Sequence, residues 1–156
     1  DADTGTQLWA APAVRSVTDL LLWQQPAHRR RSGRGATLPA RTLLIASTGT
    51  TGLWALDPET GREIWRRELP LGGVSRPVPM LGALLVASTS LGLFLVHPLD
   101  GRIIDGFGTG EGVSMTPAAH GRRAFVVTDG GRLLSLLVTP PLDDARAPHG
   151  APSARL

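Results

Sequence analysis

Four closely spaced arginines are the residues of this chain whose type and spacing could do chemistry. Arg29, Arg30, Arg31 and Arg34 fall within the segment QQPAHRRRSGRGATLPART, residues 24–42. Guanidinium groups at this density bind phosphates or an acidic protein partner. No aromatic residue is interleaved with them, so stacking on nucleic-acid bases is not expected. We interpret the cluster as part of a solvated insertion loop, with an electrostatic contact as the alternative.

The other polar patterns predict no catalytic, cofactor-binding or metal site. Gly108–Gly112 lacks the lysine and the helix start that a phosphate-binding loop needs, so we interpret it as a linker between repeats. The opening D-A-D-T-G resembles the start of a calcium loop, but Pro12 stands where the loop needs a glutamate. The four histidines are not spaced as ligand pairs, and the chain has no cysteine. We therefore expect no enzyme activity from this chain.

The basic character belongs to one segment and not to the whole chain. The net charge is +3, and all sixteen basic residues are arginine because there is no lysine. Residues 10–42 hold six of these arginines against one aspartate. No apolar run is long enough for a membrane span. The chain begins at Asp1 without a leader pattern, so we expect any signal peptide to have been removed or to lie upstream.

A repeat of about forty residues supplies the elements that must position these side chains. LLIASTGTTGLWALDPETGREIW, from Leu43, aligns with LLVASTSLGLFLVHPLDGRIIDGF, from Leu84, and AFVVTDGGRLLSLLV, from Ala124, is a third, shorter copy. Each copy holds apolar runs separated by glycine-containing turns, and helical periodicity is absent. Four strands in each period of about forty residues predict an all-β fold, a segment of a β-propeller built from four-stranded antiparallel blades.

The strand count predicts three blades' worth of strands in residues 1–138. An outer strand comes first, with the motif copy Asp1–Trp9 that opens the chain, two full blades follow, and the last blade lacks its outer strand. The insertion 24–42 and the Pro- and Ala-rich tail 139–156 have no periodicity, so we expect both to be flexible. Propellers need about four to eight blades to close. We expect a fragment of a larger ring, with ring completion by self-association as the alternative.

The motif A-L-D-P-E-T-G-R-E-I-W resembles the tryptophan-docking motif of the PQQ-like propeller repeat, A-x-D-x-x-T-G-K-x-x-W. The matching residues are Ala55, Asp57, Thr60, Gly61 and Trp65, with Asp1, Thr4, Gly5 and Trp9 in the first copy. A later copy is degenerate, because Asp105 occupies the tryptophan position. By residue type, Asp and Thr cap a turn, Gly adopts an unusual φ, and Trp buries its ring between blades. We interpret the motif as structural docking, and Trp23 and Trp54 as core residues.

The resemblance implies two classes of function. Quinoprotein dehydrogenases of this family bind PQQ and calcium at the ring centre through groups that include an Asn and often a vicinal Cys pair, and this chain has neither residue type. Other members resemble the outer-membrane assembly lipoprotein or serve as sensor and scaffold domains. We predict a non-enzymatic scaffold or protein-binding platform without a cofactor, periplasmic or exposed to the cell envelope, with a protein partner at its loop face. A portion of a PQQ-dependent dehydrogenase and a sensor domain attached to a kinase are the alternatives.

Overall fold

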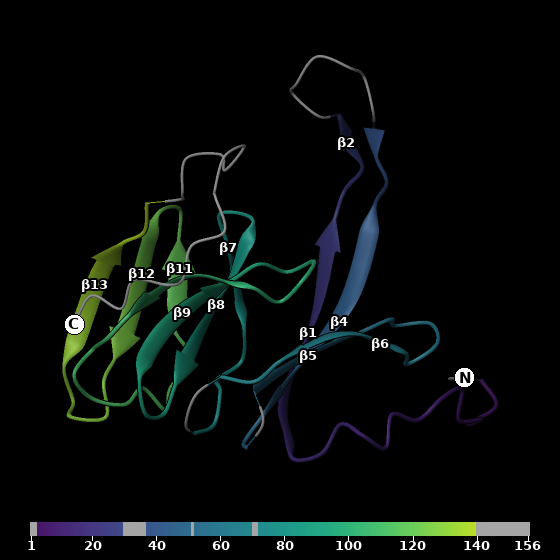
Figure 1. The fold of residues 1–156 in the computed structure, drawn as a ribbon, viewed down its shortest axis with the longest axis horizontal. Helices are drawn as coiled ribbons and strands as arrows, with labels where there is room; N and C mark the ends of the chain where they lie inside the picture. The colour runs from purple at the N-terminus through teal and green to yellow at the C-terminus, as the bar shows by residue number, and fades with distance from the viewer. Residues whose placement is uncertain (1–2, 30–36, 51, 70–71, 140–156) are drawn as a thin grey trace.

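The computed structural model describes residues 3–29, 37–50, 52–69 and 72–139. Every regular element in these ranges is a β-strand, and the strands form three antiparallel sheets of three or four strands that stand side by side, together with the two-stranded hairpin β2-β3 (Figure 1). The strands are β1 (Val17–Gln25), β2 (His28–Arg29), β3 (Thr37–Leu38), β4 (Arg41–Thr48), β5 (Gly52–Leu56), β6 (Glu63–Arg67), β7 (Val78–Met80), β8 (Ala83–Ser88), β9 (Gly92–Val96), β10 (Ile103–Phe107), β11 (Ala118–His120), β12 (Arg123–Val127) and β13 (Leu133–Leu137). The predicted all-β class is confirmed.

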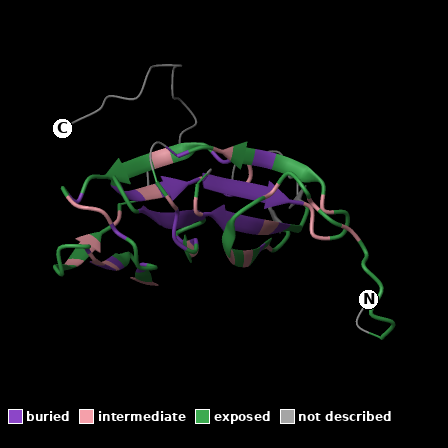
Figure 2. Ribbon diagram, turned by 90° about the horizontal axis from the view of Figure 1, so that it is seen from below, coloured by how far each residue is buried: buried purple, intermediate pink, exposed green. Residues whose placement is uncertain are grey.

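Each sheet is a meander of consecutive strands. The first has the order β1-β4-β5-β6, the second β7-β8-β9-β10 and the third β11-β12-β13. The middle strands are covered on both faces: all five residues of β5 and all six of β8 are buried (Figure 2). A strand with two covered faces has no need of polar residues at alternate positions, so it shows as an unbroken apolar run in the sequence.

The sheets repeat one another in register. Three cross-strand pairs stand forty residues apart: Ile45–Ala55, Leu85–Leu95 and Phe125–Ser135. Equal spacing along the chain therefore gives equal positions in the three sheets. The repeat found in the sequence corresponds to one blade.

Two apolar cores lie between neighbouring sheets. Ile45 and Leu53 of the first sheet are packed in one cluster with Leu84 and Val86 of the second. A separate cluster joins Leu85 and Leu93, among others, to Ala124 and Val126 of the third sheet. Burial of apolar surface between successive sheets is the force that holds a propeller together.

The main chain also links each sheet to the one before it. The amide of Val74 donates to the carbonyl of Thr48 over 3.3 Å, and the amide of Val113 donates to the carbonyl of Ser88 over 3.1 Å. Both donors lie in the segment that enters a new sheet, and both acceptors end the second strand of the previous one. These bonds recur at the same place in the repeat, so they fix the height of each sheet against its neighbour.

Two segments differ from the sequence prediction. The prediction of an outer strand at the start of the chain is wrong for the described residues, because residues 3–16 contain no strand and the described chain offers no sheet edge for one to join. The segment 24–42, expected to be a flexible loop, is partly a hairpin: Gln24 and Gln25 end β1, and β2 pairs with β3 beyond them. The predicted tail 139–156 lies outside the described residues apart from Thr139.

The turn between β7 and β8 offers a test of local strain. Leu81 adopts φ +51°, a left-handed conformation that costs a leucine about 1 kcal/mol. Because Gly82 follows it at φ +77°, Leu81→Asn gives the Asn-Gly pair that a tight hairpin turn favours. We expect Leu81→Asn to raise the free energy of unfolding by about 0.5–1 kcal/mol in urea denaturation.

Leu91→Asn is the matched control for this substitution. Leu91 is an exposed turn leucine that also precedes a glycine, but its φ is not positive. A gain in stability for Leu91→Asn as large as that for Leu81→Asn would show that lost surface hydrophobicity, and not relief of the left-handed φ, is the cause.

Candidate functional site

Two tryptophans dock on the turn of the repeat that follows them. The indole nitrogen Nε1 of Trp9 donates to the carbonyl of Pro58 over 3.0 Å, and that of Trp65 donates to the carbonyl of Pro98 over 2.9 Å. Trp65 is buried and Trp9 half-buried. The two rings therefore have equivalent polar partners, forty residues apart.

A glycine lies under each ring. A Cβ added to Gly61 would lie 2.4 Å from Cε3 of Trp9, and one added to Gly101 would lie 2.5 Å from Cε3 of Trp65. Both glycines have φ +69°. Glycine is needed at these positions for two separate reasons, the left-handed backbone and the close approach of the indole.

The turn that presents Pro58 is held by Asp57. Its Oδ1 accepts the amides of Glu59 and Thr60 over 2.9 and 3.0 Å, and its carbonyl accepts the amide of Gly61. The backbone N–H of Thr60 is the main cause that lowers the pKa of the Asp57 carboxyl. The side chain therefore stabilises the turn as a carboxylate.

His97 takes the place of Asp57 in the next repeat, and the turn survives the change. The amide of His97 donates to Arg102 and its carbonyl accepts from Gly101, as the backbone of Asp57 does with its own turn. Its Nδ1 lies 2.9 Å from Oδ1 of Asp100, which also accepts the amide of Arg102. The backbone bonds, and not the side chain, are the common feature of the two turns.

The structure brings the motif residues together across repeats and not within one. Trp9 of the first copy meets the turn that contains Asp57, Thr60 and Gly61, while Trp65 points to the second sheet. Thr4 and Gly5 lie in a turn of their own, and Asp1 lies outside the described residues. That these contacts hold neighbouring blades together stays a prediction.

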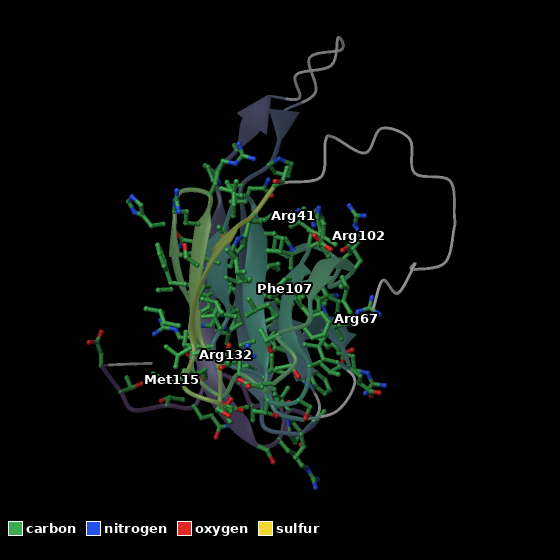
Figure 3. All side chains as sticks on the ribbon, turned by 90° about the vertical axis from the view of Figure 1, so that its left-hand side faces the viewer. Arg41, Arg67, Arg102, Phe107, Met115 and Arg132 are labelled. Atoms are coloured by element: carbon green, nitrogen blue, oxygen red, sulfur yellow. The ribbon has the colours of Figure 1, made fainter. Side chains whose placement is uncertain are left out.

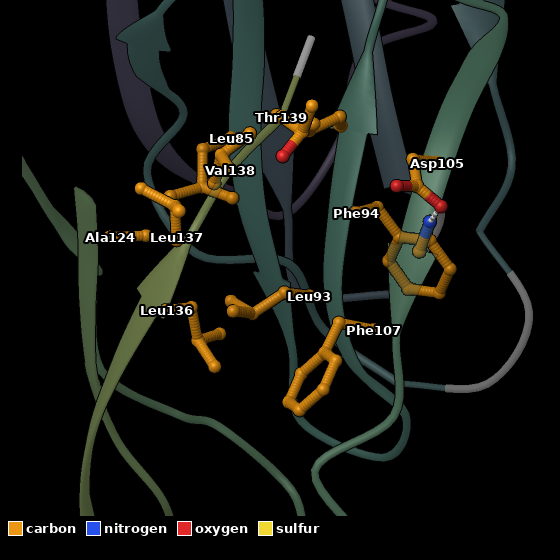
Figure 4. A pocket seen from close by; sticks show the side chains of 12 residues that line it. Leu85, Leu93, Phe94, Asp105, Phe107, Ala124, Leu136, Leu137, Val138 and Thr139 are labelled. Carbon is orange, nitrogen blue, oxygen red and sulfur yellow. Dashed lines mark hydrogen bonds between the residues drawn. The ribbon is translucent and has the colours of Figure 1, made fainter. Parts of the chain in front are cut away.

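Asp105 stands where the repeat expects a third tryptophan, and a pocket lies at that interface. The pocket has a volume of about 320 Å³ and lies between the second and third sheets. Figure 4 shows Phe94 and Phe107 facing Leu136 and Val138 across it, with Asp105 at one side. A carboxylate and apolar walls in a space of this size are typical of small-molecule pockets. Sequence analysis missed the pocket, although the replacement of tryptophan by aspartate was its signal.

A polar cluster ties the linker Gly108–Gly112 to the third sheet. Oγ1 of Thr128 donates to Oε2 of Glu111 over 2.7 Å, and Nη2 of Arg132 lies 3.2 Å from Oε1 of Glu111. Arg132 also donates to the carbonyl of Thr109. The hydrogen bond from Thr128, and next the charge of Arg132, lower the pKa of the Glu111 carboxyl. The interpretation of this segment as a linker is consistent with its place between β10 and β11.

The basic cluster predicted from the sequence lies almost wholly outside the described residues. Arg30, Arg31 and Arg34 are outside them, and only the backbone of Arg29 is described, in β2. The described Arg41 lies toward the end of the molecule that bears this hairpin, while Arg132 lies toward the opposite end (Figure 3). The proposed electrostatic contact of the cluster stays a prediction.

The described ranges hold no group of three or more His, Asp or Glu side chains close enough to bind a metal ion. Within the same ranges there is no helix with the length and apolar character needed to span a membrane.

Known proteins of one kind match this chain in sequence. A family model described as outer membrane protein assembly factor BamB matches residues 1–136. The outer membrane protein assembly factor BamB of Legionella pneumophila (strain Paris) is 24% identical over 119 residues, which are 76% of this chain and 30% of that protein. The chain therefore spans less than a third of the length of this relative.

Solved structures match the fold. The computationally designed Ika4 protein superposes with a TM-score of 0.54 at 10% identity, over 62% of this chain and 61% of that protein. BamB from Moraxella catarrhalis superposes with a TM-score of 0.52 at 23% identity, over 62% of this chain and 30% of that chain. At these identities the likeness concerns the fold alone, and it confirms propeller-type blades.

The glycine under the docked indole gives a test of the docking role. We expect Gly101→Ala to lower the free energy of unfolding by the cost of a left-handed alanine, about 1–2 kcal/mol, and further because its Cβ would displace the Trp65 ring. Gly110→Ala is the matched control: its φ is +75°, but open space surrounds the added methyl group. Urea denaturation followed by tryptophan fluorescence measures both. Equal losses in the two variants would contradict a role for the indole contact.

Glu111 gives a test by pH. Its pKa is lower in the folded chain than in the unfolded chain, so its stabilising contribution is full above the ordinary glutamate range and is lost as the pH falls through the folded pKa. We expect Glu111→Gln to lower stability at pH 7 and to reduce the decline in stability between about pH 5 and pH 3. Urea denaturation at several pH values measures this, with the exposed Glu68→Gln as control. An unchanged pH slope in Glu111→Gln would contradict the contribution.

Proposed function

Because this chain belongs to the family described as outer membrane protein assembly factor BamB, we propose that it is a non-enzymatic propeller scaffold of the bacterial envelope whose loops bind other proteins. The match over residues 1–136 is the observation that carries the proposal, and it confirms the resemblance to PQQ-like repeats. Because the chain spans only 30% of its relative, the role is proposed for these blades as part of a ring whose remaining blades complete it.

The relatives support a proposed cellular location for the protein as well as a proposed role. Both the family and the relative from Legionella pneumophila are described by the assembly of outer membrane proteins. We therefore propose that this chain acts in the periplasm or at another surface of the cell envelope. Its proposed partners are proteins that take part in the assembly of the outer membrane.

One end of the sheets is the proposed binding face. The turns that join the first and second strands of the sheets lie at the end that bears the β2–β3 hairpin (Figure 1). These connections contain several arginines and no acidic residue. The turns after β5 and β9 lie at the same end and add the acidic residues Asp57, Glu59 and Asp100, of which Asp57 and Asp100 accept backbone amides of their own turns. In the described part, Arg41, Arg122 and Arg123 are exposed there. The cluster Arg29–Arg34 belongs to the same connection of the first sheet, so we propose an acidic partner surface for this end.

The opposite end has a different character. The connections there include Glu111 and Asp129, and both carboxylates are used by neighbouring parts of the chain: Asp129 accepts the amide and the hydroxyl of Ser114 at 2.9 and 3.0 Å. Acceptors that are occupied within the chain are less available to a partner. The basic end therefore fits a binding role better.

Removal of two arginines tests the binding face. We expect the double variant Arg122→Gln/Arg123→Gln to bind purified outer-membrane assembly proteins of the same bacterium about three- to tenfold more weakly, because exposed interface charges contribute roughly 0.2–1 kcal/mol each. Biolayer interferometry at low and high salt measures this, and the salt dependence should fall with the lost charges. The matched control is Arg15→Gln/Arg76→Gln, which removes two exposed arginines outside these turns.

Two outcomes would contradict the proposal. Equal weakening in the two double variants would show that net charge alone, and not the turn surface, governs binding. Titration of the chain with PQQ and calcium, followed in the visible range, addresses the non-enzymatic role. We expect no saturable change, and saturable binding would favour the dehydrogenase alternative.

A further inference from the structure

The pocket between the second and third sheets lies where an indole lies between the first and second. Asp105 pairs with Leu95 across β10 and β9, as Trp65 pairs with Ala55 across β6 and β5. Trp65 is buried between the first two sheets, whereas Asp105 is exposed and borders the pocket. The aspartate therefore leaves open the place that the tryptophan fills at the previous interface.

The walls of the pocket correspond to the residues that enclose Trp65. The Trp65 ring lies in one apolar cluster with three residues of the second sheet and its turn: Leu84, Val96 and Leu99. Their counterparts forty residues later all line the pocket: Ala124, Leu136 and Thr139. The two interfaces thus share one frame, with a ring inside the first and a space of about 320 Å³ inside the second.

The side chains of this interface account for the space. Ala124 is smaller than its counterpart Leu84 by an isopropyl group. Leu95 is larger than its counterpart Ala55 by the same group, so these two exchanges offset each other. The indole missing at Asp105 is therefore the main loss of volume. Because Leu95 and Ala124 are buried between the sheets, the floor of the pocket belongs to the interior of the row and not to its ends.

A negative charge and two aromatic rings border the pocket on the side of the second sheet. Oδ1 of Asp105 accepts the amide of Gly106 over 2.8 Å, and no arginine or histidine of the described ranges forms an ion pair with this carboxylate. Phe94 and Phe107 line the pocket together with it (Figure 4). A carboxylate attracts a cation more strongly where apolar walls exclude part of the water, and aromatic faces attract cations as well. An apolar ligand with one positive charge fits these walls.

We propose that this pocket binds a small aromatic amine, with its ring in the place of the missing indole and its ammonium group at Asp105. Phe94 and Phe107 then meet the ring by aromatic contacts, which favour offset or edge-to-face packing. The volume of the pocket is within the range of small-molecule sites. The proposal goes beyond the binding of proteins at the turns and does not rest on it.

Tryptamine is the probe, because it combines an indole with an ammonium group. Isothermal titration calorimetry of the complete protein that contains these blades should give saturable binding, with a dissociation constant of roughly 10–100 μM for a ligand of this size. Indole acetate has the same ring and the opposite charge, so it should bind about tenfold more weakly or less. Absence of saturable tryptamine binding overturns the proposal, whether the pocket has no affinity for it or another segment of the protein fills the space.

Two substitutions at Asp105 test where the ligand lies. Asp105→Trp restores the residue of the repeat and should abolish tryptamine binding, because the new indole fills the pocket. Asp105→Asn keeps the shape and removes the charge, so it should weaken tryptamine binding about tenfold without weakening the binding of indole acetate. Thermal unfolding of both variants shows that the fold is kept. Tryptamine binding of full strength in Asp105→Trp overturns the proposal, since the ligand would then lie elsewhere.

Glu63→Gln is the matched control for the lost charge. Glu63 is an exposed carboxylate on β6, the outer strand of the first sheet, and it does not line the pocket. This variant should keep the tryptamine affinity of the unaltered protein. A loss as large as that in Asp105→Asn would show that net charge governs binding, and it would overturn the assignment of the ammonium group to Asp105.

Discussion

The constraint on which this structure depends is that each sheet has two apolar faces. A sheet with one apolar face can turn the other to water, but β5 and β8 are buried on both sides. Such a sheet is stable only between two neighbours, so the blades must stand in a row and the row must be closed or covered at its ends. Ile45 and Leu84 meet this need in the interior of the row. Leu133 and Leu22, at its two ends, do not.

Apolar contact alone does not fix the position of one sheet on the next, and we predict that the polar bonds of the docked tryptophans add a fixed direction to it. An indole N–H has one donor, so its bond to the carbonyl of Pro98 places the Trp65 ring at one height and one angle. Gly101 then permits the ring to lie flat against the turn. Where Asp105 replaces the tryptophan, the linker residue Glu111 bonds Thr128 and Arg132 of the third sheet instead. At both interfaces these side-chain contacts add to the main-chain bonds of Val74 and Val113.

The inner strands of the sheets are predictable because local pattern and burial alone determine their residues. The run of apolar residues at Leu84–Ser88 predicts β8 within one residue, and the Asp57 turn follows from Pro and Gly at their required positions. The start of the next sheet is set by contacts across the interface: β7 begins at Val78, and Val74 before it makes a single bridge to Ser88 of its own sheet and a bond to Thr48 of the previous one.

The segments whose secondary structure the sequence pattern predicts wrongly are those whose structure depends on a neighbouring strand from another part of the chain. The pattern of residues 5–9 is that of an outer strand, yet strand formation requires a neighbouring edge, and pattern cannot tell whether one is present. The insertion 24–42 departs from its prediction for the opposite reason, since the ladder of β1 and β4 extends into it and supports strands that its composition does not favour. The five residues of the docking motif can be recognised in the sequence. The sequence pattern does not show that the tryptophan and the turn it contacts belong to different blades.

The phase of the repeat in the sequence differs from the phase of the sheets. The copies that begin at Leu43 and Leu84 each start in the second strand of one sheet and run past its outer strand, so the sequence copy and the sheet are out of step by one strand. The tryptophan of the motif therefore contacts the turn of the next copy, as Trp65 does at Pro98, while Asp105 stands at this position before the third sheet. Between the first and second sheets the chain is joined covalently and by this contact at the same time, because the segment that follows β6 leads directly into the sheet on which Trp65 lies.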